Sequence, residues 1–218
     1  MRDSFGSARE PHRFLELVVP MRHIVAMDLI LKSERLLLRP LVETDLDVEI
    51  EIGTDPGVMK YIVEPKTEDQ IAQEMPNYVR RCAGGCIGIW CVTDRSTEEK
   101  FGTAILLPLP IDEDYRNWDL VAGDELPDCE IEIGYILKKS AWGKGYATET
   151  CRRLLKFAFQ ETPLNEIVAV TDPKNIASQN VLRKSGLAEE GMRRAYAKQH
   201  PGYRITRQQW SEKNQKAS

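Results

Sequence analysis

The sequence predicts an α+β domain built on a mixed β-sheet. Two apolar runs, CIGIWCVTD and KFGTAILLPL, are separated by the short polar segment RSTEE, which is the pattern of an antiparallel hairpin. A third alternating run, CEIEIGYIL, follows a long polar loop, and helical and strand patterns alternate after it. Strands that first pair as a hairpin and then alternate with helices are typical of an α+β fold with a mixed sheet.

The amino-terminal end of the domain is predicted to be a strand followed by a helix. ERLLLRPL, residues 34–41, has the pattern of a strand that ends at Pro40. TDLDVEIEIGTD follows, and it predicts a helix with a cap at Thr44 and a stop near Gly53.

A second helix is predicted in KTEDQIAQEMPNYVRRCAGG, before the hairpin. Thr67 is a good cap, and the pair Gly84 and Gly85 is a typical helix stop. The apolar residues between them recur at helical spacing: Ile71, Met75 and Val79. Pro76 has no amide hydrogen to donate, so we expect it to kink or split this helix.

The carboxy-terminal half is predicted to alternate helices with strands. One apolar stripe predicts an amphipathic helix and consists of Ala147, Cys151, Leu154, Leu155 and Ala158. EIVAVTD then predicts a buried strand. Asn175 is expected to cap a shorter helix that Gly186 closes, and GYRITRQQW, residues 202–210, is predicted to be the last strand.

Length and composition favour one domain. The chain has 218 residues and 42% apolar side chains, enough to bury a proper core. We assign residues 31–212 to this domain, residues 1–30 to an amino-terminal arm of unknown role and residues 213–218 to a tail. The net charge of -4 argues against a general grip on nucleic acid. No apolar run approaches the ~20 residues of a membrane-spanning helix.

The five cysteines predict neither a disulfide framework nor a metal site. An odd number of cysteines without a signal peptide favours reduced thiols and a cytoplasmic location. Cys82 and Cys86 lack a second pair, and the histidines lie far from them in the sequence, so we expect no metal.

The segment WGKGYATE, residues 142–149, places two glycines where a strand is followed by a helix. A helix start exposes unpaired amides and a partial positive charge, so it attracts anions. Gly143 and Gly145 leave these amides accessible, and Lys144 adds a full charge. Neither a Walker loop nor a dinucleotide-binding turn fits, since Gly145 follows the lysine and Thr148 replaces a third glycine. The alternatives are a site for another phosphate-bearing ligand or a structural turn.

Three segments in a fixed order favour the ligand site: EIGYIL, WGKGYATE and PKNIASQNVLRKSGLAEEG. With ERLLLRPL in front, the chain from about Glu34 to Trp210 resembles the GNAT superfamily of acyl-CoA-dependent N-acetyltransferases, and within it the RimJ/RimL-like branch of ribosomal-protein N-terminal acetyltransferases. The resemblance implies a mixed, mostly antiparallel sheet of about seven strands flanked by helices, with a splay between the fourth and fifth strands. It also implies acetyl-CoA as co-substrate and a primary amine as acceptor.

The resemblance places the co-substrate on particular residues. The pantetheine arm is expected to meet main-chain groups of Tyr135, Ile136 and Leu137 in the splay. The pyrophosphate is expected on Trp142, Gly143, Lys144, Gly145, Tyr146, Ala147 and Thr148. Trp142 departs from the Arg or Gln that the superfamily usually has. Asn175 and Ser178 match the Asn-x-x-Ser of the branch, near the amide end of pantetheine and the sulfur, with a helix cap and a polar surface residue as the alternative.

In this family the amine attacks the thioester directly within a ternary complex, which calls for a base and for oxyanion donors. Glu130 and Glu132 alternate onto one face of the fourth strand and are the candidate bases, with a solvent-facing carboxylate ladder as the alternative. Main-chain amides near Ile136 are the candidate oxyanion donors.

The leaving thiolate also benefits from an acid. Many superfamily members have a tyrosine where this chain has Leu182, so that route is absent. Ser178 is the candidate acid, with Tyr196 and Tyr203 behind it.

The acceptor is predicted from amine basicity. An α-amine of pKa ~7.8 is about a tenth neutral at pH 7, whereas a lysine amine near ~10.4 is less than a thousandth neutral. A site without a conspicuous base therefore favours a protein N-terminus. A small amine (an aminoglycoside, a polyamine or another metabolite) and a non-catalytic acyl-CoA-binding sensor stay open. The acidic loop 111–128 is either a solvated face or an attractor of cationic acceptors, and both a monomer and a homodimer fit the sequence.

Overall fold

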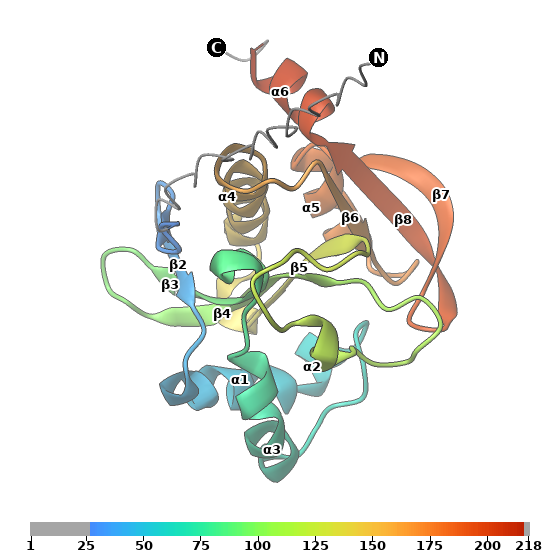
Figure 1. The fold of residues 1–218 in the computed structure, drawn as a ribbon. Helices are drawn as coiled ribbons and strands as arrows, with labels where there is room; N and C mark the ends of the chain where they lie inside the picture. Colours follow the sequence, from blue (N-terminus) through green and yellow to red (C-terminus); the bar gives the residue numbers. More distant parts are fainter. Residues whose placement is uncertain (1–26, 216–218) are drawn as a thin grey trace, which may run out of the picture.

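The computed structural model describes residues 27–215, which form one mixed sheet between two layers of helices (Figure 1). Most of the predicted arm, up to residue 26, and the last three residues of the predicted tail lie outside the described residues. The strands follow the order β1-β2-β3-β4-β5-β6-β8-β7 across the sheet. Their bounds are β1 Leu31–Lys32, β2 Leu36–Pro40, β3 Gly88–Asp94, β4 Lys100–Pro108, β5 Ile131–Leu137, β6 Glu166–Val170, β7 Ala188–Ala195 and β8 Lys198–Thr206.

Neighbouring strands are antiparallel, with one exception at the centre of the sheet. β5 and β6 run parallel and share a single aligned pair within residues 27–215, Glu132 with Val168. β5 is paired along its whole length with β4 on its other side, from Pro108 opposite Ile131 to Gly102 opposite Leu137. Beyond Glu132, β5 therefore separates from β6, which is the predicted splay between the fourth and fifth strands.

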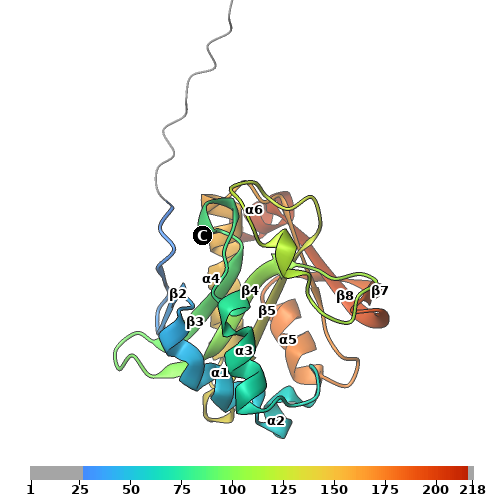
Figure 2. The ribbon, with the colours of Figure 1, turned by 60° about the horizontal axis from the view of Figure 1, so that its bottom comes forward.

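The helices cover both faces of the sheet. Their bounds are α1 Leu46–Gly53, α2 Pro56–Met59, α3 Glu68–Tyr78, α4 Tyr146–Glu161, α5 Ile176–Lys184 and α6 Arg207–Gln215. Figures 1 and 2 show α1, α2 and α3 on one side and α4 and α5 on the other. The predicted apolar stripe of α4 faces the sheet, since Cys151, Leu154, Leu155 and Ala158 are fully buried. Burying such a stripe is what holds an amphipathic helix on a sheet.

The sheet of the described residues has eight strands rather than about seven. β1 and β7 were not predicted, and the chain end also folds differently from the prediction. Residues 202–210 are not one strand: β8 stops at Thr206 and α6 begins at Arg207. Thr206 and Gln209 form a capping box, in which each side chain accepts a hydrogen bond from the other residue's amide, at 3.2 and 3.0 Å. The Arg207 guanidinium also donates to the carbonyl oxygens of Thr162 and Leu164, which anchors the helix start.

The unpredicted strand β7 forms a hairpin with β8. Tyr196 and Ala197 connect the two strands, with φ angles of 50° and 55°. Residues other than glycine rarely adopt this left-handed backbone conformation, so the sequence carried no signal for a turn here. The turn is held by amide donation from Tyr196 to Pro110 and from Ala197 to Ile111, at 2.9 and 3.0 Å.

The two amino-terminal helices differ in detail from the prediction. The cap at Thr44 is wrong, since a short 3-10 turn, Glu43–Asp45, precedes α1. The cap at Thr67 is confirmed by a capping box with Gln70. α3 ends at Tyr78 and does not reach Gly84, and Pro76 lies inside its last turn.

Candidate active site

The loop between β5 and α4 has the geometry of an anion-binding turn. Gly143 and Gly145 have φ angles of 73° and 82°, and Gly145 is the residue before α4. A Cβ atom on Gly143 would lie more than 4 Å from every described atom outside its own neighbourhood. The loop is therefore open on the side of Gly143, and the amides at the start of α4 are free to receive an anion.

Arg35 holds this loop in place, and sequence reasoning missed it. Its guanidinium donates to the carbonyl oxygen of Lys144 at 2.9 Å and to the carboxylate of Glu149 at 2.8 Å, and it lies 4.6 Å from the ring centre of Tyr146. Tyr146 in turn stacks on Phe101, with ring centres 4.8 Å apart. Arg35 lies in the segment ERLLLRPL, so the only sequence signal was its place at the front of the domain.

The remaining predicted pyrophosphate residues lie around the same turn. Trp142 is half exposed, and its indole Nε1 donates to the carbonyl oxygen of Leu137 at 2.7 Å. That carbonyl is therefore engaged in this structure, whereas we expected it to face pantetheine. Ala147 and Thr148 lie in the first turn of α4 and are partly exposed.

Ser178 and Tyr135 meet across the splay. Asn175 caps α5, with its side-chain oxygen accepting from the Ser178 amide at 3.1 Å. The Tyr135 hydroxyl lies 3.1 Å from the Ser178 hydroxyl, although the two residues are 43 positions apart in the chain. Burial raises the pKa of the Tyr135 phenol, so it keeps its proton at neutral pH. The sequence predicted a main-chain role for Tyr135 and gave no sign of this contact.

The other positions considered for the general acid lie in different surroundings from Ser178. Leu182 is 2% exposed and belongs to the core, as expected for a residue without an acid role. Tyr203 is fully buried, and its hydroxyl has no partner among residues 27–215. Tyr196 lies on the opposite face of the sheet, where its hydroxyl donates to Glu132 at 2.6 Å.

The two candidate bases are both engaged in ion pairs. Glu132 is 5% exposed, and its Oε2 accepts from Arg116 at 2.7 Å and from Tyr196. Glu130 pairs with Arg193 and, at 3.2 Å, with Arg204. Glu130 and Glu132 therefore do not form the solvent-facing carboxylate ladder that was the alternative, and both carboxylates are engaged in ion pairs.

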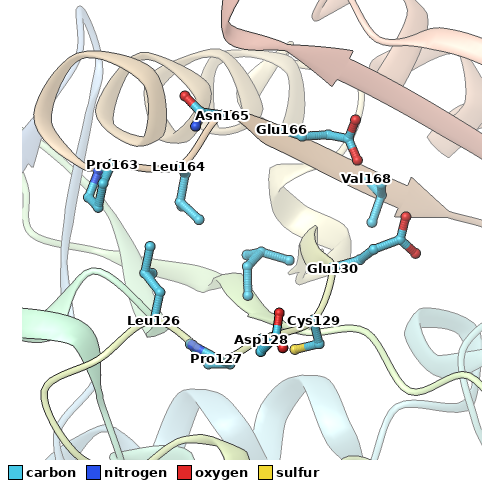
Figure 3. A pocket seen from close by; sticks show the side chains of 11 residues that line it. Leu126, Pro127, Asp128, Cys129, Glu130, Pro163, Leu164, Asn165, Glu166 and Val168 are labelled. Carbon is cyan, nitrogen blue, oxygen red and sulfur yellow. The ribbon is translucent and has the colours of Figure 1, made fainter.

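Glu130 also lines a recess of about 450 Å³ at the amino-terminal ends of β5 and β6. Figure 3 shows its carboxylate on the same side of this recess as that of Glu166. Loop 142–148 follows the other end of β5, so the recess is far from the anion-binding turn. We therefore do not place the reaction in it.

Within residues 27–215, no group of His, Cys, Asp or Glu side chains is arranged to hold a metal ion. In the same part of the chain, no helix has the length and apolar character needed to cross a membrane.

Comparison with known proteins decides the family. Residues 35–188 match the model of the acetyltransferase (GNAT) domain. The chain belongs to the GNAT acetyltransferase family. It is 30% identical over 173 residues to the uncharacterized N-acetyltransferase p20 of Bacillus licheniformis, covering 77% of this chain and 87% of that protein. It is 29% identical over 190 residues to FsC-acetyl coenzyme A-N(2)-transacetylase of Aspergillus fumigatus, covering 83% and 77%.

Solved GNAT structures share the fold. RimL, the ribosomal L7/L12 α-N-protein acetyltransferase, aligns with a TM-score of 0.60 and 14% identity, covering 81% of this chain and 97% of RimL. Spermidine N-acetyltransferase of Vibrio cholerae aligns with a TM-score of 0.62 and 17% identity, covering 82% of this chain and 99% of that protein. The aminoglycoside acetyltransferase AAC(6')-Ib aligns at 0.63 and 18%, also covering 82% and 99%. All three were solved with coenzyme A.

The GNAT protein described here is thus an N-acetyltransferase that acts on amines and uses acetyl-CoA. The predicted family, mixed sheet and enzyme class are confirmed. The individual site residues stay predictions, and the structure supplies the geometry in which to test them.

Proposed function

We propose that this GNAT enzyme transfers the acetyl group of acetyl-CoA to a protein N-terminal α-amine. The observation that carries the proposal is that both carboxylates near the middle of the sheet, Glu130 and Glu132, are held by arginines. A carboxylate oxygen that already accepts from a guanidinium group is not free to accept a proton from an amine. Such a site suits an amine that is already partly neutral at pH 7, as an α-amine is.

The loop and the splay support our assignment of the co-substrate site. We assign the pyrophosphate to the amides from Gly143 to Thr148, because the two left-handed glycines leave room for an anion there. We assign the pantetheine arm to the gap that opens beyond Glu132, where β5 stays paired with β4 but is no longer aligned with β6. Asn175 and Ser178 then lie beside its far end.

The reaction is a direct transfer in a ternary complex. The amine nitrogen attacks the thioester carbon, a C–N bond forms, and the C–S bond breaks with its electron pair leaving on sulfur. Main-chain amides near Ile136 are placed to stabilise the oxyanion. The thiolate takes a proton from the Ser178 hydroxyl, and the Ser178 oxygen takes in its place a proton that the acetylated nitrogen releases. The Ser178 hydroxyl is hydrogen-bonded to Tyr135 during this relay.

A small cationic amine is the second candidate acceptor. The loop 111–128 is rich in carboxylates, and solved relatives of this fold include a spermidine and an aminoglycoside acetyltransferase. A panel of peptides with free N-termini, lysine side chains, polyamines and aminoglycosides, assayed by release of the coenzyme thiol, separates the two candidates. A clearly higher kcat/KM on lysine or on a small amine than on peptide α-amines would overturn the proposal. Calorimetric binding of acetyl-CoA without transfer to any amine would favour a sensor.

The proposed acid gives a direct test. Ser178→Ala is expected to lower kcat by about 100-fold, the usual scale for losing a general acid, with no change in the Kd of acetyl-CoA. Steady-state kinetics and calorimetry check both quantities. Ser185→Ala, the same change at the end of α5, is the matched control and should leave kcat unchanged. An unchanged kcat in Ser178→Ala would remove Ser178 from the mechanism.

A further inference from the structure

One carboxyl group on the side of the sheet covered by α1, α2 and α3 has an oxygen without a partner among residues 27–215. Glu49 lies on α1, is 8% exposed, and its Oε1 accepts no hydrogen bond from any described residue. The hydroxyl of Thr103, on β4, lies within hydrogen-bonding reach of the same carboxyl group. A buried, incompletely bonded carboxyl group costs stability, so it calls for a functional explanation.

Glu49 lies near three partly exposed residues in the centre of the sheet. Ile105, Gly134 and Ile136 are partly exposed, whereas β4 and β5 are mostly buried elsewhere. Ile105 is paired with Gly134, and Thr103 with Ile136. We call Ile105, Gly134 and Ile136 the β4–β5 window. Thr103 is two residues from Ile105 on the same strand face, or roughly 7 Å, so Glu49 lies at one edge of the window.

The other edge of the window is formed by Glu132, two residues before Gly134 on the same strand face. Glu132 is fixed there by Arg116 and Tyr196. Gly134 has no side chain and is partly exposed, and the Ile105 side chain lies over it, 3.0 Å from where a Cβ would be. This is the part of β5 whose amides we assign to the oxyanion, so an amine that attacks the thioester would lie over the window.

Glu49 forms no ion pair with any described residue, in contrast to its neighbours, although the charge of Lys66 acts on it. Lys66 pairs with Glu74 on α3, and Glu74 also accepts from Tyr78. Charged and titratable groups surround Glu49 from the other elements packed around it: Asp45 before α1, Lys66 and Glu74, Tyr78, and Cys91 on β3. Burial raises the pKa of Glu49 to about 7, and the hydrogen bond from Thr103 offsets part of this effect. A base is most effective when its pKa lies near the working pH.

We propose that Glu49 is the general base, which removes a proton from the acceptor amine over the β4–β5 window, directly or through one water molecule. The proton of the ammonium group passes to the Glu49 carboxylate. The neutral nitrogen then forms the C–N bond and the C–S bond breaks, while the second proton that the nitrogen loses passes through the Ser178 hydroxyl to the departing thiolate. This role rests on the proposed acetyl transfer to an α-amine, and it replaces Glu130 and Glu132 as bases.

The test is Glu49→Gln, assayed with acetyl-CoA and a peptide α-amine between pH 6 and 9. At pH 7 we expect kcat to fall by about 100-fold or more, with an unchanged Kd for acetyl-CoA. The loss should shrink at pH 9, where an α-amine of pKa ~7.8 is already neutral without a base. A purely structural role of Glu49 would not give this recovery.

The matched control is Glu51→Gln, the same change on the exposed side of α1, which should retain wild-type turnover. Thermal unfolding of Glu49→Gln should occur at no lower temperature than that of the wild type, because the change removes a buried charge. Glu49→Asp, which keeps a carboxyl group, should recover part of the activity. If Glu49→Gln kept wild-type turnover at pH 7, the role of Glu49 would be overturned but the proposed function would not. Absence of transfer by the wild type to any amine would overturn the proposed function and this role with it.

Discussion

Gly145→Val is expected to weaken acetyl-CoA binding on the order of 100-fold. Gly145 adopts a φ of 82° directly before α4, a conformation that a β-branched side chain rarely takes. Valine would turn the amides of the loop away from the pyrophosphate. The loss of two charge-assisted hydrogen bonds, each worth about 1.5 kcal/mol, corresponds to this change in Kd. Calorimetric titration of acetyl-CoA into the folded variant measures it.

Gly123→Val is the control for this experiment. Gly123 has a φ of 75°, and a Cβ placed there meets no described atom within 4 Å, but it lies in the long loop before β5. The backbone strain is therefore similar, roughly 1–2 kcal/mol. Its Kd for acetyl-CoA should match that of the wild type. Equal binding by Gly145→Val and Gly123→Val would mean that loop 142–148 is not the pyrophosphate site.

Asp45→Asn is expected to destabilise the fold by roughly 3–5 kcal/mol, the scale for breaking a buried ion pair. Asp45 is fully buried and accepts two hydrogen bonds from Arg39, at 2.6 and 2.7 Å, with Lys100 at 3.0 Å. Asparagine preserves the shape but leaves Arg39 without its counter-charge. Chemical denaturation of both proteins measures the difference.

The control is Asp47→Asn, which removes the other carboxylate bonded to Lys100. The Asp47 side chain is 68% exposed, so this change should cost less than about 1 kcal/mol. A similar loss of stability in the two variants would show that burial of Asp45 is not what makes its ion pair matter.

Asp45 also predicts how stability depends on pH. Burial alone would raise its pKa, but the hydrogen bonds from Arg39, Lys100 and the Val42 amide outweigh burial and lower the pKa from 3.8 to about 2. A carboxyl group that is more acidic in the folded state stabilises the fold above its unfolded pKa. This stabilisation, about 2 kcal/mol, is lost as the pH falls from about 4 to about 2. Asp45→Asn should remove this part of the acid dependence.

Local patterns predicted much of the fold, since they report interactions between residues close in sequence. The cap at Thr67, the stripe of α4 and the β3–β4 hairpin were predicted from such patterns. Two of the wrong predictions also concern short segments of the sequence. The Tyr196–Ala197 turn adopts a conformation that its side chains disfavour, and the Thr206–Gln209 capping box was overlooked within an apparent strand.

Local sequence patterns were least informative about which residue acts as the general base. Glu130 and Glu132 were chosen because they alternate along a strand, but their partners come from distant segments, including Tyr196, 64 positions from Glu132. Glu49 carried one weak signal: it lies on the buried stripe of α1 with Val48 and Ile52, where an apolar side chain is expected. A charged residue on such a stripe indicates either a buried partner or a function.

By itself, the sequence determined the family, the co-substrate and the glycine turn before α4, because an anion-binding turn is made by consecutive residues and their main-chain amides. Only the tertiary structure decided which carboxylates are paired and that, among residues 27–215, Glu49 is buried with one oxygen unpartnered. Ion pairing and burial depend on side chains that the fold brings together from distant parts of the chain, and no local pattern records that distance.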